Sequence, residues 1–215
     1  MNFFLFSIYS FVFMMISCQS NAQTYTIETN LGSIQVKLYE QTPLHKENFE
    51  KLVADQFYDG VLFHRIIAGF MIQTGDEATK TIFDRNASGS SFKSTIPAEF
   101  VPEYFHKKGV LAAARTGDAV NPEKRSSPSQ FYIVQGRTYT DMELDQIEKQ
   151  TQVAFSEFQR GVYKTIGGTP FLDQNYTVFG EVVKGLDVVD AIAALPTRPG
   201  DYPEVDIRIL RIVKD

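Results

Sequence analysis

Short apolar segments with the alternation of β-strands recur along most of this chain, and they constrain its fold more than any other feature. Residues 24–39 alternate in this way around a turn signal at residues 30–32, which predicts a β-hairpin. Two helices are expected, one opened by Thr42 as its cap with Pro43 in the first turn, the other at residues 186–194. Many short strands with few helices indicate a mainly β barrel or sandwich. The further strands are predicted at residues 61–67, 70–74, 109–113, 130–134, 178–183 and 205–213.

The chain has 215 residues, enough for one domain with a sizeable core. It contains 18 Phe and no Trp, so the packing of that core is expected to rely on phenyl rings. The net charge is −5, and no run of Lys and Arg resembles a nucleic-acid footprint. Nucleic acid is therefore not expected as a partner.

Residues 1–22 carry no acidic or basic side chain and are dominated by large apolar ones. The apolar stretch is shorter than the roughly 20 residues of a membrane span, so it fits the core of a secretory signal. Residues 15–18 resemble a bacterial lipoprotein box, in which Cys18 is acylated and becomes the mature N-terminus. Alternatively, an ordinary signal peptidase would cleave before Gln23. Both routes predict a protein of the bacterial cell envelope that faces the periplasm, either lipid-anchored or soluble.

Residues 63–76 place one guanidinium, that of Arg65, among large apolar side chains in a strand-like segment. Burying such a cation is costly unless its donors are satisfied or it serves a site. Strand alternation puts Met71 and Gln73 on the same face, which gives an apolar wall with an amide beside it. A pocket for a small apolar group with a polar rim requires this arrangement. The alternative is a buried strand with one salt-bridged Arg.

The order of residues 63–76 resembles the signature of the cyclophilins, a family of peptidyl-prolyl cis/trans isomerases. Two further blocks follow in the family's order, at residues 129–133 and at residues 171–173 with 176–182. The resemblance covers residues 24–215 apart from one insertion. It implies a closed eight-stranded antiparallel barrel with a helix closing each end. It also implies isomerisation of X–Pro peptide bonds, a reaction for which we expect no cofactor and no metal.

The resemblance implies a catalytic site made by Arg65, Gln73 and Phe70. Arg65 would donate to the prolyl nitrogen, and Gln73 would help to hold Arg65 and the substrate backbone. Phe70 would also form part of the proline pocket. The residues implied for substrate binding, in the pocket and the adjoining groove, are Met71, Ala114, Arg115, Gln130, Tyr132, Phe171, Leu172 and Tyr176.

Four of these positions depart from the family's commonest pattern. Arg115 stands where Asn is common, which predicts some preference for acidic residues near the proline. Phe171 stands where many members have Trp, which should weaken cyclosporin binding, and Tyr176 stands where they have His. Both resemble bacterial envelope cyclophilins. Tyr132 stands where Phe is usual, so its hydroxyl must find a partner or water.

The insertion spans about residues 136–168, where the family ordinarily has a much shorter connection. Residues 140–143 form a capping-box pattern, which predicts a helix. An apolar stripe along that helix is expected from Met142, Ile147, Val153 and Phe158. Two interpretations remain open, a surface decoration and a helical flap or docking arm beside the active site.

The three histidines are scattered along the chain, without paired acidic ligands, so they make a poor metal site. His64 is expected to face away from its neighbour Arg65 as a structural residue, because adjacent strand residues point to opposite faces. His45 is placed on the first helix, and His106 in a polar loop.

The leading functional hypothesis is a monomeric prolyl isomerase that assists the folding of exported proteins by acting on unfolded or extended proline-containing chains. The alternative is a catalytically weak binding module or chaperone with the same fold. A third hypothesis, a lipocalin-like carrier of small apolar ligands, is disfavoured because Arg65 and Gln73 would lie near the pocket. A membrane is expected as a partner only through an acylated Cys18.

Overall fold

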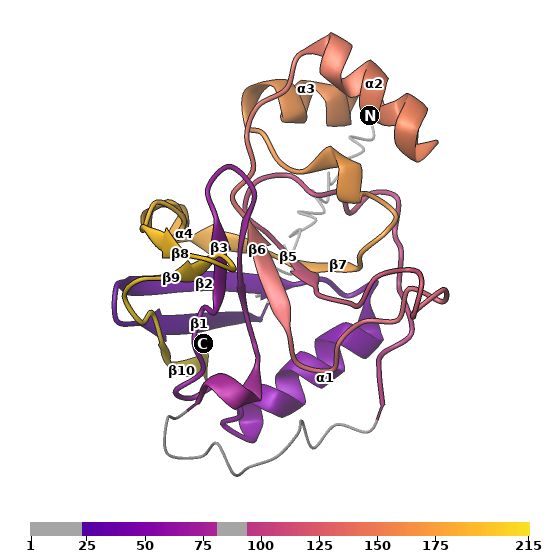
Figure 1. The fold of residues 1–215 in the computed structure, drawn as a ribbon. Helices are drawn as coiled ribbons and strands as arrows, with labels where there is room; N and C mark the ends of the chain where they lie inside the picture. Colours follow the sequence, from indigo (N-terminus) through magenta and orange to yellow (C-terminus); the bar gives the residue numbers. More distant parts are fainter. Residues whose placement is uncertain (1–22, 81–93) are drawn as a thin grey trace, which may run out of the picture.

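The computed structural model describes residues 23–80 and 94–215, and its centre is an eight-stranded antiparallel sheet. The strands are ordered β10-β1-β2-β7-β5-β6-β4-β3 (Figure 1). Most of the predicted strands are present, so the mainly β architecture is confirmed. The strands of the sheet are β1 (Thr24–Thr29), β2 (Gly32–Leu38), β3 (Arg65–Ile67), β4 (Met71–Thr74), β5 (Val110–Ala113), β6 (Phe131–Val134), β7 (Val178–Lys184) and β10 (Ile209–Lys214).

The sheet is open, which corrects the expectation of a closed barrel. Its edge strands β3 and β10 form no ladder with each other among the described residues. Residues 60–63, which precede β3, instead form three backbone hydrogen bonds with residues 207–209, around an isolated bridge between Leu62 and Arg208. The backbone N–H of Ile66 instead donates to the carbonyl of Asp201, in a small hairpin of β8 (Thr197–Arg198) and β9 (Tyr202–Pro203). This hairpin occupies the edge of β3 that β10 would need for closure.

The two expected helices are α1 (Pro43–Ala54) and α4 (Leu186–Ala193), and both contribute buried side chains to the main core. The hydroxyl of Thr42 does not cap α1, because it donates to the carbonyl of Tyr39. The carboxylate of Glu99 accepts instead from the backbone N–H groups of Leu44 and His45. A carboxylate from a distant segment thus satisfies the free donors of the first turn.

Aromatic rings fill the centre of the main core, as the abundance of Phe predicts. Phe49 of α1 packs against the rings of Tyr25, Tyr58, Phe131 and Phe179, with centroid distances of 5.5 to 6.0 Å. Edge-to-face and tilted arrangements at such distances are favoured by the quadrupoles of the rings. Among the described residues, no helix is both long and apolar enough to cross a membrane.

The segment at residues 136–168 forms two helices, α2 (Asp141–Thr151) and α3 (Glu157–Thr165), which lie together on the side of the molecule away from α1 (Figure 1). The capping box of Thr140 and Glu143 is confirmed, and Ser156 with Gln159 forms a second one at the start of α3. Gln152 adopts a left-handed conformation and ends α2.

The single apolar stripe predicted for this segment is wrong. Two of its members, Met142 and Phe158, are 80% and 72% exposed, and only Ile147 and Val153 pack against the buried residues of this segment. Leu144 and Tyr163 are fully buried instead, in a separate aromatic cluster. The segment therefore has a small core of its own beside the sheet.

Candidate active site

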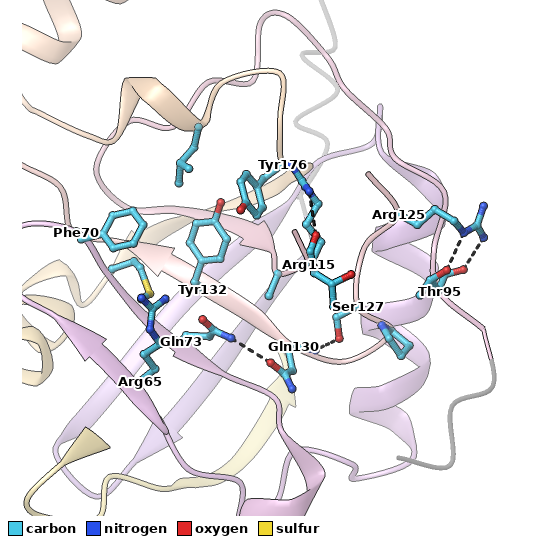
Figure 2. Close-up of a pocket in the computed structure, with 15 residues that line it drawn as sticks. Arg65, Phe70, Gln73, Thr95, Arg115, Arg125, Ser127, Gln130, Tyr132 and Tyr176 are labelled. Carbon is cyan, nitrogen blue, oxygen red and sulfur yellow. Dashed lines mark hydrogen bonds between the residues drawn. The ribbon is translucent and has the colours of Figure 1, made fainter. Parts of the chain in front are cut away.

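A cavity of about 350 Å³ opens on the face of the sheet opposite the main core. This volume suits a small ligand group. Arg65 and Phe70 lie toward one end of the cavity, and Thr95 and Arg125 toward the other (Figure 2). Its lining comprises Arg65, Phe70, Met71, Gln73, Thr95, Ala114, Arg115, Thr116, Arg125, Ser127, Pro128, Gln130, Tyr132, Leu172 and Tyr176.

The structure thus brings together the described site residues that the sequence predicted, with one exception. Phe171 is not part of the lining; it is 41% exposed and packs against the ring of Phe70 at 5.7 Å. It therefore lies at the rim, beyond the apolar wall. The predicted lipidation site, Cys18, lies outside the described residues.

The register of three neighbouring strands places the polar and aromatic site residues in one row. Arg65 of β3 is directly opposite Gln73 of β4, and Gln73 is directly opposite Tyr132 of β6. Met71 lies two residues from Gln73 and shares its face, as the alternation predicts. The intervening residue, Ile72, points into the main core.

Asp201 holds the guanidinium of Arg65, a contact that the sequence did not reveal. The Nε of Arg65 donates to Oδ2 of Asp201 at 3.1 Å, and both side chains are about 40% exposed. Asp201 lies beside Gly200 in the turn of the β8–β9 hairpin and has a φ of 62°. Aspartate tolerates this left-handed region, so the Gly-Asp pair predicts a turn, although not what the turn contacts.

The amide of Gln73 has a different partner from the one expected. Its Nε2 donates to Oε1 of Gln130 at 3.0 Å (Figure 2), and among the described residues Arg65 donates to Asp201 rather than to the amide oxygen of Gln73. Gln130 is fixed in turn, because its backbone N–H donates to Oγ of Ser127. Since Asp201 accepts only from Nε, and no other described residue bonds with the guanidinium of Arg65, its two Nη groups can donate to a bound peptide.

The apolar part of the cavity is walled by aromatic and aliphatic side chains. Met71 and Tyr132 are almost fully buried, and Phe70, Leu172 and Tyr176 pack against them. The hydroxyl of Tyr132 bonds with Nε2 of His106 at 3.1 Å. Burial raises the pKa of Tyr132 well above its ordinary value, so the phenol stays neutral. The hydroxyl therefore has a partner, and the ring forms an apolar wall.

The side chain of Arg115 is held by contacts within the protein and does not extend freely into the groove. Its guanidinium donates to the carbonyls of Asn175 and Thr116 and to the carboxylate of Asp118, and it stacks over the ring of Tyr176 at 4.5 Å. Only 5% of its side chain is exposed. Its charge is paired, so its influence on a substrate is expected to be small.

Residues 121–128 supply part of the lining that the sequence did not predict. Ser127 and Pro128 border the cavity, and Ser126 is buried, with its Oγ bonded to Nε2 of His45. Arg125 donates to both the carbonyl and the hydroxyl of Thr95 (Figure 2). The polar composition of this segment indicates an exposed loop, but its contacts with residues far along the chain hold much of it against the domain.

Comparisons with known proteins agree with this geometry. The family model described as "Cyclophilin type peptidyl-prolyl cis-trans isomerase/CLD" matches residues 24–214. A putative peptidyl-prolyl cis-trans isomerase of Staphylococcus saprophyticus is 34% identical over 85% of this chain and 87% of its own length. A putative bifunctional phosphatase/peptidyl-prolyl cis-trans isomerase of Streptococcus pyogenes is 35% identical over 86% of this chain, but the match spans only 37% of that protein.

A solved structure supports the fold. The crystal structure of a cyclophilin type peptidyl-prolyl cis-trans isomerase of Cryptosporidium parvum superposes with a TM-score of 0.65, at 24% identity, over 90% of this chain and 97% of that one. The eight-stranded sheet thus has the fold of a cyclophilin-type protein. The chain belongs to the cyclophilin family and is a peptidyl-prolyl cis-trans isomerase.

Proposed function

We propose that this isomerase accelerates X–Pro isomerisation during the folding of exported proteins, with Arg65 as the catalytic donor and the cavity beside it as the proline pocket. The observation that carries the catalytic role is the placement of the Arg65 guanidinium, held by Asp201 at the edge of a cavity walled by Met71 and Tyr132. A cation and an apolar wall side by side are what a prolyl peptide requires.

The physical basis of the reaction is the partial double bond of the amide. Resonance imposes a rotational barrier of about 18–20 kcal/mol, while the two X–Pro isomers differ by only about 0.5–1 kcal/mol. In the twisted transition state the prolyl nitrogen regains its lone pair. A cationic donor directed at that nitrogen stabilises the transition state more than either planar isomer.

The cavity residues would supply the binding that this mechanism needs. Phe70, Met71, Tyr132 and Leu172 present apolar surface to the prolyl ring, and burial of that ring holds the nitrogen near Arg65. Gln73 and Gln130, joined by a hydrogen bond, offer their remaining polar atoms to the backbone of the substrate. Arg65 then acts on an amide whose position is fixed.

Two features favour the alternative of a catalytically weak binding module: the polar hydroxyl of Tyr132 in the proline pocket and the inserted segment at residues 136–168. The hydroxyl of Tyr132 does not compromise the proline pocket, because His106 satisfies it. The other feature, the segment at residues 136–168, bears on binding rather than on Arg65. Turnover of a proline tetrapeptide by the protein tests the choice directly: rates near the uncatalysed value would favour the binding module.

The proposals that the protein is exported and lipid-anchored are based on the composition of residues 1–22. Acylation of Cys18 is the one that can be tested by labelling. We predict that Cys18→Ser abolishes incorporation of a palmitate analogue in a bacterial host and moves the protein from the membrane fraction to the soluble envelope fraction. Ser17→Ala, which keeps a small residue before the cysteine, serves as the matched control and should stay labelled. An unlabelled, soluble wild-type protein would point to cleavage before Gln23 instead, and recovery from the cytosol would refute export.

A modest preference for acidic residues near the proline is expected from the cations that line the groove. Because Asp118 neutralises Arg115, we predict that peptides with Glu flanking the proline react only about twofold to threefold faster than matched Lys peptides. Raising the ionic strength should reduce the difference. Equal rates, or faster Lys peptides, would contradict this expectation.

A further inference from the structure

A chain of buried polar groups connects the wall of the proline pocket to helix α3. The hydroxyl of Tyr132 bonds with Nε2 of His106 at 3.1 Å, and Nδ1 of His106 bonds with Oδ1 of Asp173 at 2.8 Å. Tyr163 of α3 donates its hydroxyl to Oδ2 of Asp173 at 2.6 Å. All four residues are at most 4% exposed. The chain therefore runs from the substrate cavity into the core of residues 136–168.

The direction of each hydrogen bond follows from the chemistry of a carboxylate. Asp173 only accepts when ionised, and it also accepts the backbone N–H of His106 at 2.8 Å. Nδ1 of His106 therefore carries the proton, and in the neutral ring Nε2 presents a lone pair. With the ring neutral, the hydroxyl of Tyr132 donates to Nε2, so each member orients the next one.

Both ends of the chain are held by packing. Tyr163 has ring contacts with Phe105 and Phe155, at centroid distances of 5.4 and 5.5 Å. The ring of Tyr132 is nearly parallel to that of His106 and meets Tyr176 edge-on. Hydrogen-bond networks in such a dry interior have one low-energy arrangement, because an unsatisfied member is costly.

Asp173 also follows directly after Leu172, another wall of the pocket. Its carboxylate bonds with His106, which in turn bonds with the hydroxyl of Tyr132. Tyr163 contributes the hydrogen bond to the second carboxylate oxygen. Without that bond the carboxylate is held only through Oδ1, by the two hydrogen bonds from His106.

We propose that Tyr163 is a positioning residue for the proline pocket: through Asp173 and His106 it fixes the ring of Tyr132, so that the helical segment at residues 136–168 determines how tightly the prolyl ring is held. The inference rests on the proposed role of Tyr132 as a pocket wall. Tyr163 does not touch the substrate, so its effect belongs to peptide affinity and not to the chemical step.

The first test compares Tyr163→Phe with wild type in peptide turnover and in peptide affinity measured by NMR titration. The variant keeps the ring and loses only the hydroxyl. We expect KM and Kd to rise about threefold to tenfold, the effect of one hydrogen bond, with kcat within about twofold of wild type. Tyr139→Phe is the matched control, since Tyr139 packs in the same cluster but its hydroxyl is not one of the hydrogen-bonded groups that lead to Tyr132. Unchanged affinity in Tyr163→Phe, or equal losses in both variants, would overturn the proposal.

The second test asks whether the effect passes through Tyr132. In a Tyr132→Phe background the series of hydrogen bonds lacks the hydroxyl at its pocket end. Adding Tyr163→Phe should then cause no further loss of peptide affinity. If the two losses of affinity instead multiply, the proposal is overturned. In wild type, peptide binding should shift the backbone amide signal of Tyr163, and in Tyr132→Phe it should not. This measurement applies even where Tyr163→Phe folds poorly. Because affinity is the readout, a protein without turnover would refute the catalytic proposal and still test this one.

Discussion

Replacement of Arg65 by Ala is expected to lower kcat/KM for a proline tetrapeptide by two orders of magnitude or more. The loss would fall on kcat, because the guanidinium is needed at the pyramidal nitrogen of the transition state while the apolar wall still binds the prolyl ring. A hundredfold loss corresponds to about 2.7 kcal/mol of transition-state stabilisation. A protease-coupled assay with cis-enriched peptide measures it.

Two further variants separate the charge of Arg65 from the geometry of its donors and from its positioning by Asp201. Arg65→Lys keeps the cation and loses the planar fork of donors, so we expect it to remain severely impaired. Asp201→Asn weakens a contact in which both partners are about 40% exposed, so we expect only a few-fold loss of kcat/KM. Activity of Arg65→Ala within threefold of wild type would remove Arg65 from the mechanism.

Replacement of Asp173 by Ala is expected to destabilise the protein by about 3 kcal/mol or more. It would leave the backbone N–H and Nδ1 of His106 and the hydroxyl of Tyr163 buried without their acceptor. Each unsatisfied buried donor costs about 1–3 kcal/mol. Urea unfolding followed by circular dichroism gives the difference in the free energy of unfolding.

Asp141→Ala is the matched control for this prediction. Like Asp173, Asp141 bonds with two other residues, Arg160 and Lys164 of α3, but it lies on the surface. Its replacement should therefore change the midpoint of urea unfolding little. Similar destabilisation by the two substitutions would show that burial of Asp173 does not govern its contribution.

Local patterns were sufficient to predict most of the sheet. Alternation located β1 and β2, and turn residues located the hairpin between them. The segment at residues 61–67 was harder, because only Arg65–Ile67 pairs as a strand and the preceding residues bond instead to residues 207–209. The choice between an open and a closed sheet depends on the β8–β9 hairpin, whose two-residue strands carry almost no periodic signal.

The lining of the pocket was also predictable, since its residues lie in contiguous blocks whose order carries the family resemblance. The supporting contacts were not. His106 lies between Phe105 and two lysines and reads as part of a polar loop, yet it is fully buried. Its partners Asp173 and Tyr132 are far away along the chain, and so is Asp201 from Arg65. Pairings between distant polar groups leave no local pattern.

The most direct test of the catalytic proposal is two-dimensional exchange NMR on a proline peptide with wild-type protein and with Arg65→Ala, because it reports binding and isomerisation together. We predict that wild type produces cis–trans exchange peaks and that Arg65→Ala binds the peptide with an affinity within about threefold of wild type but shows exchange slower by two orders of magnitude. Equal exchange rates at equal affinity would show that the guanidinium of Arg65 does not carry the catalysis.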